Sequence, residues 1–213
     1  MRIAKFISNA GICSRRNAEK LILEGKVIIN NKICDKPNIN VNLNDKILVN
    51  NKIISINKSI RVWKMYKPIK TICSNNDPQK RKTVFDLMPS NLPRLISIGR
   101  LDFMSEGLLL FTNNGDIARK FELPSSNLLR VYRVCLNGII NKKKINKIKI
   151  EIEKSTSNGT WGLFKLLEGK NREIRNICRY FKWKISRLIR VQYGNIKLSK
   201  LKPGNLVEIK NYL

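Results

Sequence analysis

Residues 99–115 read GRLDFMSEGLLLFTNNG and predict a buried strand with a loop in front of it. Residues 108–111 are continuously apolar, as expected for a strand covered on both faces, and residues 113–115 are typical of a turn. In front of the strand, Asp102 lies between two glycines and beside Arg100, on a loop that the core strand anchors. From these residues alone, a surface turn with an Arg/Asp pair is favoured over an active-site carboxylate.

The sequence on either side of this stretch mixes strands and helices without βαβ alternation, and therefore predicts an α+β fold. Residues 61–66 alternate as a strand that ends before Pro68, and residues 185–191 and 206–209 indicate two closing strands. Residues 116–121 indicate a short helix between them.

Residues 169–183 predict the clearest helix of this part of the chain. Its apolar stripe consists of Ile174, Ile177, Cys178 and Phe181. On another face, Arg172, Arg175 and Arg179 recur at i, i+3 and i+7, where three guanidinium groups fit phosphate contacts better than a merely solvated surface. Residues 139–154 are rich in Lys, Ile and Asn, and their pattern does not distinguish a strand from a helix.

Residues 1–57 predict a small α/β module of their own. Apolar positions recur at helical spacing in residues 3–10, and Ser14 is expected to cap a second helix. Asparagine pairs at residues 30–31 and 50–51 tolerate positive φ, and each is expected to close a hairpin. Residues 57–59 are expected to link this module to the rest of the chain.

Cations are left on the exterior of the module when its apolar helix faces turn inward. The candidates for RNA contact are Arg2, Lys5, Arg15, Arg16, Lys20 and Lys26. Arg15 and Arg16 would stand in the first turn of the second helix, where the helix dipole disfavours positive charge. Their placement is poor for stability and favours a binding role.

The composition of the 213-residue chain points to a polyanionic partner. Lys and Arg number 43 against 15 acidic residues, a formal net charge of +28. Part of the Lys excess is consistent with A+T-rich codons, but the arginines cluster, so nucleic acid remains the first candidate. Neither a membrane-length apolar run nor a secretory signal layout is present, and we expect a cytoplasmic protein, or an organellar one if the host is a eukaryote.

The inventory of reactive side chains excludes several chemistries. The chain contains no His, which rules out His-dependent triads and imidazole general bases. Its five Cys are widely spaced without a C-x-x-C pair, so neither a disulfide framework nor a zinc site is expected. Chemistry would have to use Asp, Glu, Lys, Tyr, Cys or Ser.

Several stretches resemble known families in order and spacing. Residues 10–30, AGICSRRNAEKLILEGKVIIN, resemble the S4-type RNA-binding domain. Residues 99–115 resemble the signature of the S4-domain-containing rRNA pseudouridine synthases, the RsuA family. Residues 129–134 and 168–175 are similar to a strand and a helix of that family, and residues 186–194 are similar to its subgroup acting on large-subunit rRNA.

The resemblance implies an S4-like RNA-binding domain at residues 1–57 and a catalytic domain at residues 61–213 with a mixed, mainly antiparallel sheet. It implies site-specific isomerisation of uridine to pseudouridine in rRNA, in the 23S RNA of the large subunit, free or in an assembling particle. The family's chemistry needs neither cofactor nor metal, and we expect a monomer.

By the same resemblance, Asp102 is the nucleophile. Arg175 is the partner that keeps its carboxylate ionised, and Arg100 helps fix the loop. Tyr132 would serve as a platform for the base and as a hydroxyl that handles protons, and Leu188 would line the base pocket. Without the resemblance, ordinary core packing is the better interpretation of Tyr132 and Leu188.

The chain departs from the family at a few positions. Tyr66 stands where an Asn is usual, and Lys70 falls near a customary Gly. The interval between Val134 and Glu168 is shorter than in most relatives. Two alternatives stay open: a noncatalytic rRNA-binding or ribosome-assembly factor that keeps the fold, and a DNA-binding regulator, which is weaker because no recognition helix is visible.

The high positive charge predicts strongly salt-dependent RNA binding. If six or more phosphates are contacted, affinity should fall ~10³-fold or more between about 50 and 200 mM salt, because binding releases condensed counterions. Fluorescence anisotropy with an rRNA fragment measures this slope. An affinity that stays flat with salt would contradict the prediction.

Overall fold

A computed structural model describes residues 1–56, 59–138, 140, 150–210 and 212 of the chain. Two segments for which the sequence analysis made a prediction lie partly outside these described residues. Of the expected linker at residues 57–59, the first two residues lie outside the described part of the chain. The same holds for residues 139 and 141–149 of the stretch 139–154, for which the sequence left strand and helix open. From Ile150 onwards, this stretch forms a strand.

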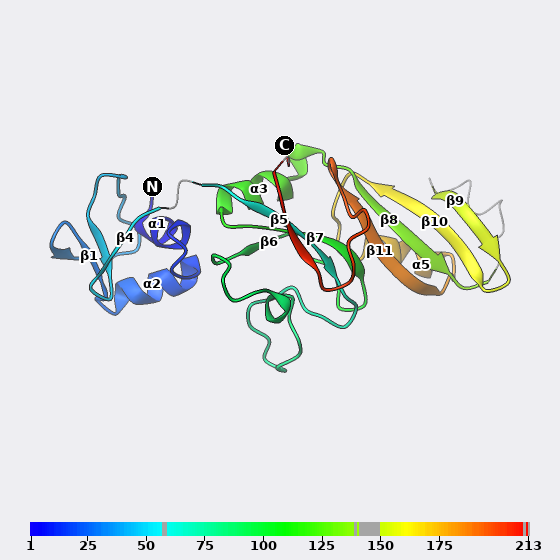
Figure 1. Cartoon of the computed structure of the whole chain (residues 1–213), viewed down its shortest axis with the longest axis horizontal. Helices are drawn as coiled ribbons and strands as arrows, with labels where there is room; N and C mark the ends of the chain where they lie inside the picture. The colour runs from blue at the N-terminus through cyan, green and yellow to red at the C-terminus, as the bar shows by residue number, and fades with distance from the viewer. Residues whose placement is uncertain (57–58, 139, 141–149, 211, 213) are drawn as a thin grey trace. The chain divides into compact units, whose positions relative to one another are not determined.

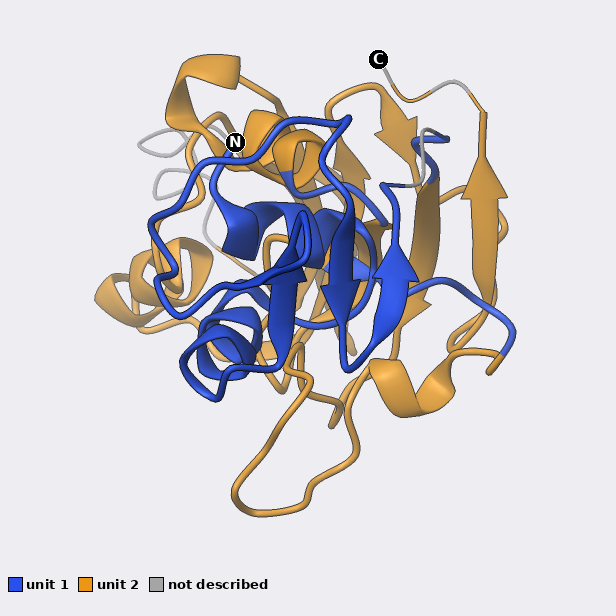
Figure 2. Cartoon of the chain, turned by 90° about the vertical axis from the view of Figure 1, so that its left-hand side faces the viewer, with its two compact units in different colours: residues 1–61, 91–96, 113–115 blue, residues 62–90, 97–112, 116–213 orange. Residues whose placement is uncertain are grey.

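The chain folds into two compact units (Figure 2). Unit 1 comprises residues 1–61, 91–96 and 113–115, and unit 2 comprises residues 62–90, 97–112 and 116–213. Most of each unit is a long stretch of sequence, and two short segments from later in the chain are assigned to unit 1.

Unit 1 contains two helices and the antiparallel sheet β2-β1-β3-β4 (Figure 1). The bounds are α1 Ile3–Asn9, α2 Arg15–Leu23, β1 Val27–Ile29, β2 Lys32–Ile33, β3 Ile47–Val49 and β4 Lys52–Ile54. Ser14 caps α2 as expected, since its side chain accepts a hydrogen bond of 3.2 Å from the backbone N–H of Asn17. Both predicted hairpins form, because residues 30–31 and 50–51 adopt φ between 48° and 67°.

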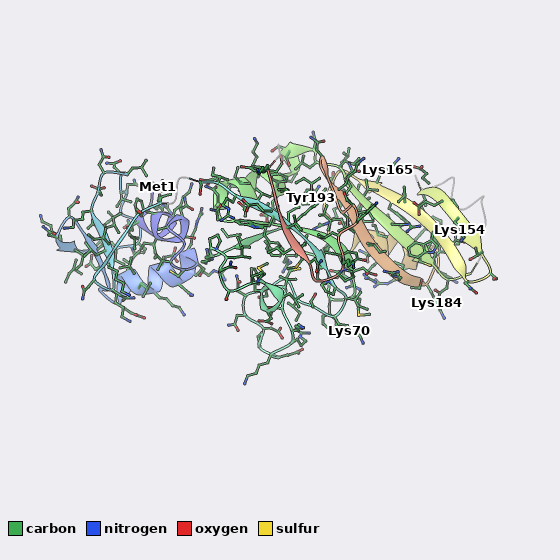
Figure 3. All side chains as sticks on the ribbon, viewed as in Figure 1. Met1, Lys70, Lys154, Lys165, Lys184 and Tyr193 are labelled. Carbon is green, nitrogen blue, oxygen red and sulfur yellow. The ribbon has the colours of Figure 1, made fainter. Side chains whose placement is uncertain are left out.

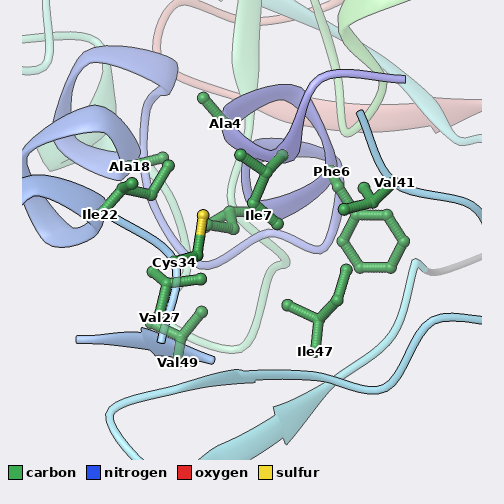
Figure 4. Close-up of a cluster of buried hydrophobic side chains, with 11 residues drawn as sticks. Ala4, Phe6, Ile7, Ala18, Ile22, Val27, Cys34, Val41, Ile47 and Val49 are labelled. Carbon is green, nitrogen blue, oxygen red and sulfur yellow. The ribbon is translucent and has the colours of Figure 1, made fainter. Parts of the chain in front are cut away.

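The core of unit 1 lies between the helices and the sheet (Figure 4). Ile7 of α1 and Ile22 of α2 are completely buried, and Val27 and Ile47 of the strands pack into the same cluster. Leu21 of α2 is half-buried at the margin of this cluster. The helix faces predicted from apolar spacing are thus the faces that the sheet covers.

The predicted cations of unit 1 remain mostly at its surface. Arg2, Arg15, Arg16, Lys20 and Lys26 are exposed. Lys5, in contrast, is half-buried. Lys26 forms an ion pair of 2.7 Å with Glu24, but both side chains are half exposed, so this pair adds little stability.

Unit 2 is organised by a large mixed sheet with the strand order β13-β5-β7-β11-β8-β10-β9 (Figure 1). β12 pairs with β11, and β6 pairs with β7. The strands are β5 Val62–Lys67, β6 Ile96–Ile98, β7 Glu106–Thr112, β8 Arg130–Leu136, β9 Ile150–Thr156, β10 Gly159–Leu166, β11 Ile185–Tyr193, β12 Ile196–Lys197 and β13 Leu206–Ile209. The remaining elements are η1 Phe85–Leu87, α3 Gly115–Glu122, η2 Pro124–Ser126 and α5 Glu173–Tyr180. The β7–β11 pair is parallel, and the other strand pairs along this order are antiparallel.

The two central strands differ in how well the sequence predicted their burial. All seven residues of β7 are buried, as its continuous apolar run indicated. The alternation predicted for residues 61–66 is wrong, because β5 is buried at every position except the half-buried Lys64. β5 lies inside the sheet between β13 and β7, in a region that is covered on both faces.

Helix α5 packs on the sheet through a shared apolar cluster. Ile174 and Cys178 of the helix contact this cluster together with Val134, Phe164 and Leu188 of three strands. None of the helices formed by the described residues combines the length and the apolar composition needed to span a bilayer.

The helix predicted at residues 169–183 is too long at both ends. Arg172 has a φ of 53° and precedes the first helical residue, and Lys182 has a φ of 58° after the last. Because left-handed backbone cannot continue an α-helix, Arg172 lies outside it. The expected stripe of Arg172, Arg175 and Arg179 on one helix face is therefore wrong.

Gly107 permits the close approach of β7 and β11. Its φ is 101°, and a Cβ atom there would lie 2.4 Å from the Arg190 carbonyl oxygen. Gly107→Ala should therefore lower the free energy of unfolding by on the order of 3 kcal/mol, as measured by urea denaturation.

Gly204→Ala is the matched control for this substitution. Gly204 has a similar φ of 86°, but a Cβ atom there would meet none of the described residues beyond its chain neighbours within 4 Å. The free energy of unfolding should therefore fall by only about 1 kcal/mol, the cost of placing alanine in left-handed backbone. Equal losses in the two variants would contradict the close-approach argument.

Candidate active site

Asp102 lies on the loop between β6 and β7. A turn closes behind it, because the Ser105 backbone N–H donates to the Asp102 carbonyl oxygen at 3.0 Å. Leu101 is buried, and its backbone N–H and carbonyl both contact the Cys73 Sγ at 3.4 Å. The Asp102 side chain is 33% exposed, so the loop is anchored while the carboxylate stays open to solvent.

Arg175 connects α5 to this loop. Its Nε lies 3.3 Å from the Asp102 Oδ2, and its Nη2 donates to the Met104 carbonyl at 2.9 Å and to the Ser105 Oγ at 3.1 Å. The Arg172 Nη1 lies 3.7 Å from the same Asp102 oxygen. The Arg175 guanidinium thus holds both the Asp102 carboxylate and the turn that follows it, because its planar group carries several N–H donors.

A cavity of about 820 Å³ opens beside the carboxylate, within unit 2. Among its lining residues are six that the sequence singled out: Arg100, Asp102, Tyr132, Arg172, Arg175 and Leu188. Arg179 is exposed and does not line the cavity, and the candidate cations of residues 1–57 belong to unit 1. The volume falls in the range of sites for small ligands, about 300 to 1,000 Å³.

The predicted site residues differ in burial. Leu188 is buried on β11 and Tyr132 is half-buried on β8, and both belong to or contact the apolar cluster under α5. Arg100 is exposed at the cavity rim. A third of the Asp102 side chain is exposed, so the ion pair with Arg175 orients it more than it compensates for burial.

Two buried arginines of the cavity wall were not singled out from the sequence. Arg130 donates to the Leu167 carbonyl at 2.7 Å and to the Tyr193 hydroxyl at 3.1 Å, and Tyr193 donates in turn to the Phe121 carbonyl. Arg190 donates through Nε to the Leu108 carbonyl at 2.7 Å. Among the described residues, the buried Arg190 Nη2 has no hydrogen-bond partner. Both arginines lie in stretches that resemble the family, residues 129–134 and 186–194, and this resemblance is the sequence feature that could have identified them.

Lys67 supports the Asp102 loop from inside the protein. It is completely buried, and its Nζ donates to the Ser105 carbonyl at 2.8 Å and to the Pro68 carbonyl at 2.9 Å. Burial lowers the pKa of Lys67 to about 8, although Cys73 and Asp102 partly offset this. The amine therefore holds the end of the loop in place at a cost in desolvation.

Glu106 has partners on neighbouring strands. Its carboxylate accepts the Tyr66 hydroxyl at 2.8 Å and two N–H groups of Arg187 at 2.9 and 3.1 Å. Glu106 is the first residue of β7, and its side chain joins β5 to β11. Burial, followed by the hydrogen bond to Glu106, raises the pKa of Tyr66 to about 12.

Residues 61–180 match the RNA pseudouridylate synthase family, and residues 1–47 match the S4 domain. The chain belongs to the RNA pseudouridylate synthase family. This confirms the family, the enzyme class and the type of fold that the sequence predicted.

Within the described residues, no group of three or more His, Cys, Asp or Glu side chains is placed to hold a metal ion.

The matches to several relatives cover nearly the whole chain. An uncharacterized RNA pseudouridine synthase of Rickettsia typhi is 49% identical over 99% of this chain and 92% of its own length. A ribosomal large subunit pseudouridine synthase B of Buchnera aphidicola from Acyrthosiphon pisum is 38% identical, over 99% of this chain and 93% of its own length. A crystal structure of a pseudouridylate synthase shares the fold, with a TM-score of 0.66 and 22% identity over 99% and 96% of the two chains.

The raised pKa of the buried Tyr66 predicts how the stability of this synthase depends on pH. Because the pKa of Tyr66 is raised to about 12 in the folded protein, its contribution is complete below the ordinary value of 10 and is lost as the pH rises towards 12. Tyr66→Phe should remove this part of the alkaline loss, as measured by urea unfolding at successive pH values. Tyr180→Phe, which removes an exposed phenol, is the control and should leave the profile unchanged.

Proposed function

We propose that this protein isomerises a specific uridine of large-subunit ribosomal RNA to pseudouridine, with the Asp102 carboxylate as nucleophile. The observation that carries the proposal is the position of this carboxylate at the cavity, held by the Arg175 guanidinium at 3.3 Å on a loop with a buried anchor. The name of the Buchnera relative supports the large subunit as the source of the substrate.

The reaction needs one nucleophile and no net oxidation or hydrolysis. The N1–C1′ bond of uridine breaks, a C1′–C5 bond forms, N1 ends protonated, and the C5 proton leaves to solvent. A carboxylate that attacks either the ribose or the uracil ring keeps the base on the enzyme while it turns. We propose that neither cofactor nor metal takes part.

Positioning is the task of the residues around the carboxylate. Arg175 binds both the Asp102 carboxylate and the backbone that follows, so it fixes the direction of attack. We assign Tyr132 as the platform for the base and Leu188 as an apolar wall, because a uridine that leaves its RNA stack needs replacement contacts. The unpartnered Nη2 of Arg190 supports a hydrogen bond to a uracil oxygen.

RNA binding extends beyond the cavity in this proposal. Residues 1–57 would act as an S4-like binding domain through their exposed cations, and residues 61–213 as the catalytic domain. Arg172 and Arg179 would contact phosphates near the cavity. We further propose that the enzyme works as a monomer, and a ribosomal RNA substrate supports the cytoplasm as its site of action.

Loss of tritium from rRNA whose uridines are labelled at C5 tests the nucleophile. Asp102→Asn should reduce tritium release by on the order of 10³-fold or more, because the amide cannot attack, while RNA affinity stays within about twofold. Asp116→Asn, which neutralises an exposed carboxylate of α3, is the control and should keep full activity. Full activity of Asp102→Asn would sink the assignment.

The same assay separates the enzyme from a noncatalytic assembly factor. The wild-type protein should release tritium from large-subunit rRNA or its assembling particles, and not from small-subunit rRNA. Binding without release from any rRNA or particle would favour the assembly factor. Competition with duplex DNA decides against a DNA-binding regulator if rRNA is preferred.

A further inference from the structure

Three aromatic side chains and three cations gather where α5 ends. The aromatic cluster consists of Tyr180, Phe181 and Trp183, and the cations beside it in the sequence are Arg179, Lys182 and Lys184. All three cations are exposed, and Figure 3 shows Lys184 on the segment that leads from α5 into β11. None of these six residues lines the cavity of the candidate active site.

The rings form a short ladder that runs from the core to the surface. Trp183 packs against the apolar cluster under α5, and Phe181 stacks on it with centroids 4.9 Å apart and 24° between the planes. Tyr180 meets Phe181 edge to face at 5.0 Å. Tyr180 is 80% exposed, so the inner rings hold an outer ring whose surface is open to solvent.

The backbone holds this arrangement in place. The Trp183 N–H donates to the Cys178 carbonyl at 2.8 Å and the Lys182 N–H donates to the Arg179 carbonyl at 3.0 Å, the two bonds of a Schellman motif. Lys182 occupies its left-handed position with a φ of 58°, where glycine is usual. The turn folds the chain back so that Trp183 reaches Phe181.

We propose that this aromatic cluster binds an unpaired base of the RNA substrate, outside the cavity that takes the uridine, by stacking on Tyr180. An exposed aromatic ring flanked by cations fits single-stranded RNA, because bases stack on rings and phosphates pair with Lys and Arg. The inference rests on the proposed function and extends it to a second contact point on the same strand.

The position on α5 agrees with one RNA strand that reaches both places. Arg175, in the first turn of α5, contacts Asp102, and Tyr180 follows five residues later. At 1.5 Å and about 100° per residue, the two positions lie about 7.5 Å apart along the helix axis and about 140° apart around it. An RNA strand that reaches both therefore passes around the end of α5, where the chain turns back at Lys182.

Stacking is tested with two substitutions of Tyr180 in the Asp102→Asn protein, which binds RNA without turnover. Tyr180→Ala should weaken binding of a labelled oligouridine about 5- to 100-fold, because it removes the ring on which a base stacks, while Tyr180→Trp should keep the affinity. Val207→Ala removes two methyl groups from a residue of 46% exposure on β13 and is the control. Circular dichroism establishes that each variant is folded.

Lys182→Gly separates charge from shape. Glycine suits the φ of 58°, so the Schellman turn should persist while one phosphate contact is lost. The slope of log affinity against log salt should fall by about 0.7, the value for one contact with a single strand. An unchanged slope would argue against an RNA contact at this turn.

The outcomes distinguish this inference from the proposed function. Equal oligouridine affinity of folded Tyr180→Ala and its parent would overturn the stacking contact even if the wild-type enzyme releases tritium. Concentration-dependent dimers in analytical ultracentrifugation that disappear in Tyr180→Ala would also overturn it, because the cluster would then be an interface between copies. Absent tritium release with impaired binding of Tyr180→Ala would reject the catalytic proposal alone.

Discussion

The parallel contact between β7 and β11 is the interaction on which the rest of unit 2 depends. It requires a residue without a side chain at Gly107, because the backbone of Arg190 passes where a Cβ would stand. Parallel neighbours cannot be joined by a hairpin, so the chain builds other strands and α5 before it returns to β11. The contact thereby unites the loop of Asp102 with the helix that carries Arg175.

Cations buried around the cavity give the site its electrostatic character. Lys67, Arg130 and Arg190 are buried, and each donates to backbone carbonyl oxygens. Arg130 and Arg190 line the cavity, and the carbonyl dipoles that accept their hydrogen bonds do not cancel their charge, so the wall remains favourable to a polyanion such as RNA. The desolvation that this arrangement costs is reflected in the lowered pKa of Lys67.

Features that depend on a few neighbouring residues could be predicted from the sequence. The Ser14 cap and the turns at residues 30–31 and 50–51 follow from local backbone preferences. The bounds of α5 were missed because Arg172 and Lys182 adopt left-handed backbone, which helical apolar spacing does not reveal. Site residues were identified through the family resemblance, while their local patterns also fitted ordinary core packing or a surface turn.

By itself, the sequence determined the family, the fold class, the order of most elements and the positive charge that suits RNA, because these depend on motifs, spacing and composition. Only the tertiary structure decided that the Glu106 carboxylate joins Tyr66 to Arg187, that Arg130 and Arg190 wall the cavity, and that aromatic rings form a ladder at the end of α5. The reason is physical: these contacts join residues on different strands or across a left-handed turn, and their distances are set by how the sheet and α5 pack.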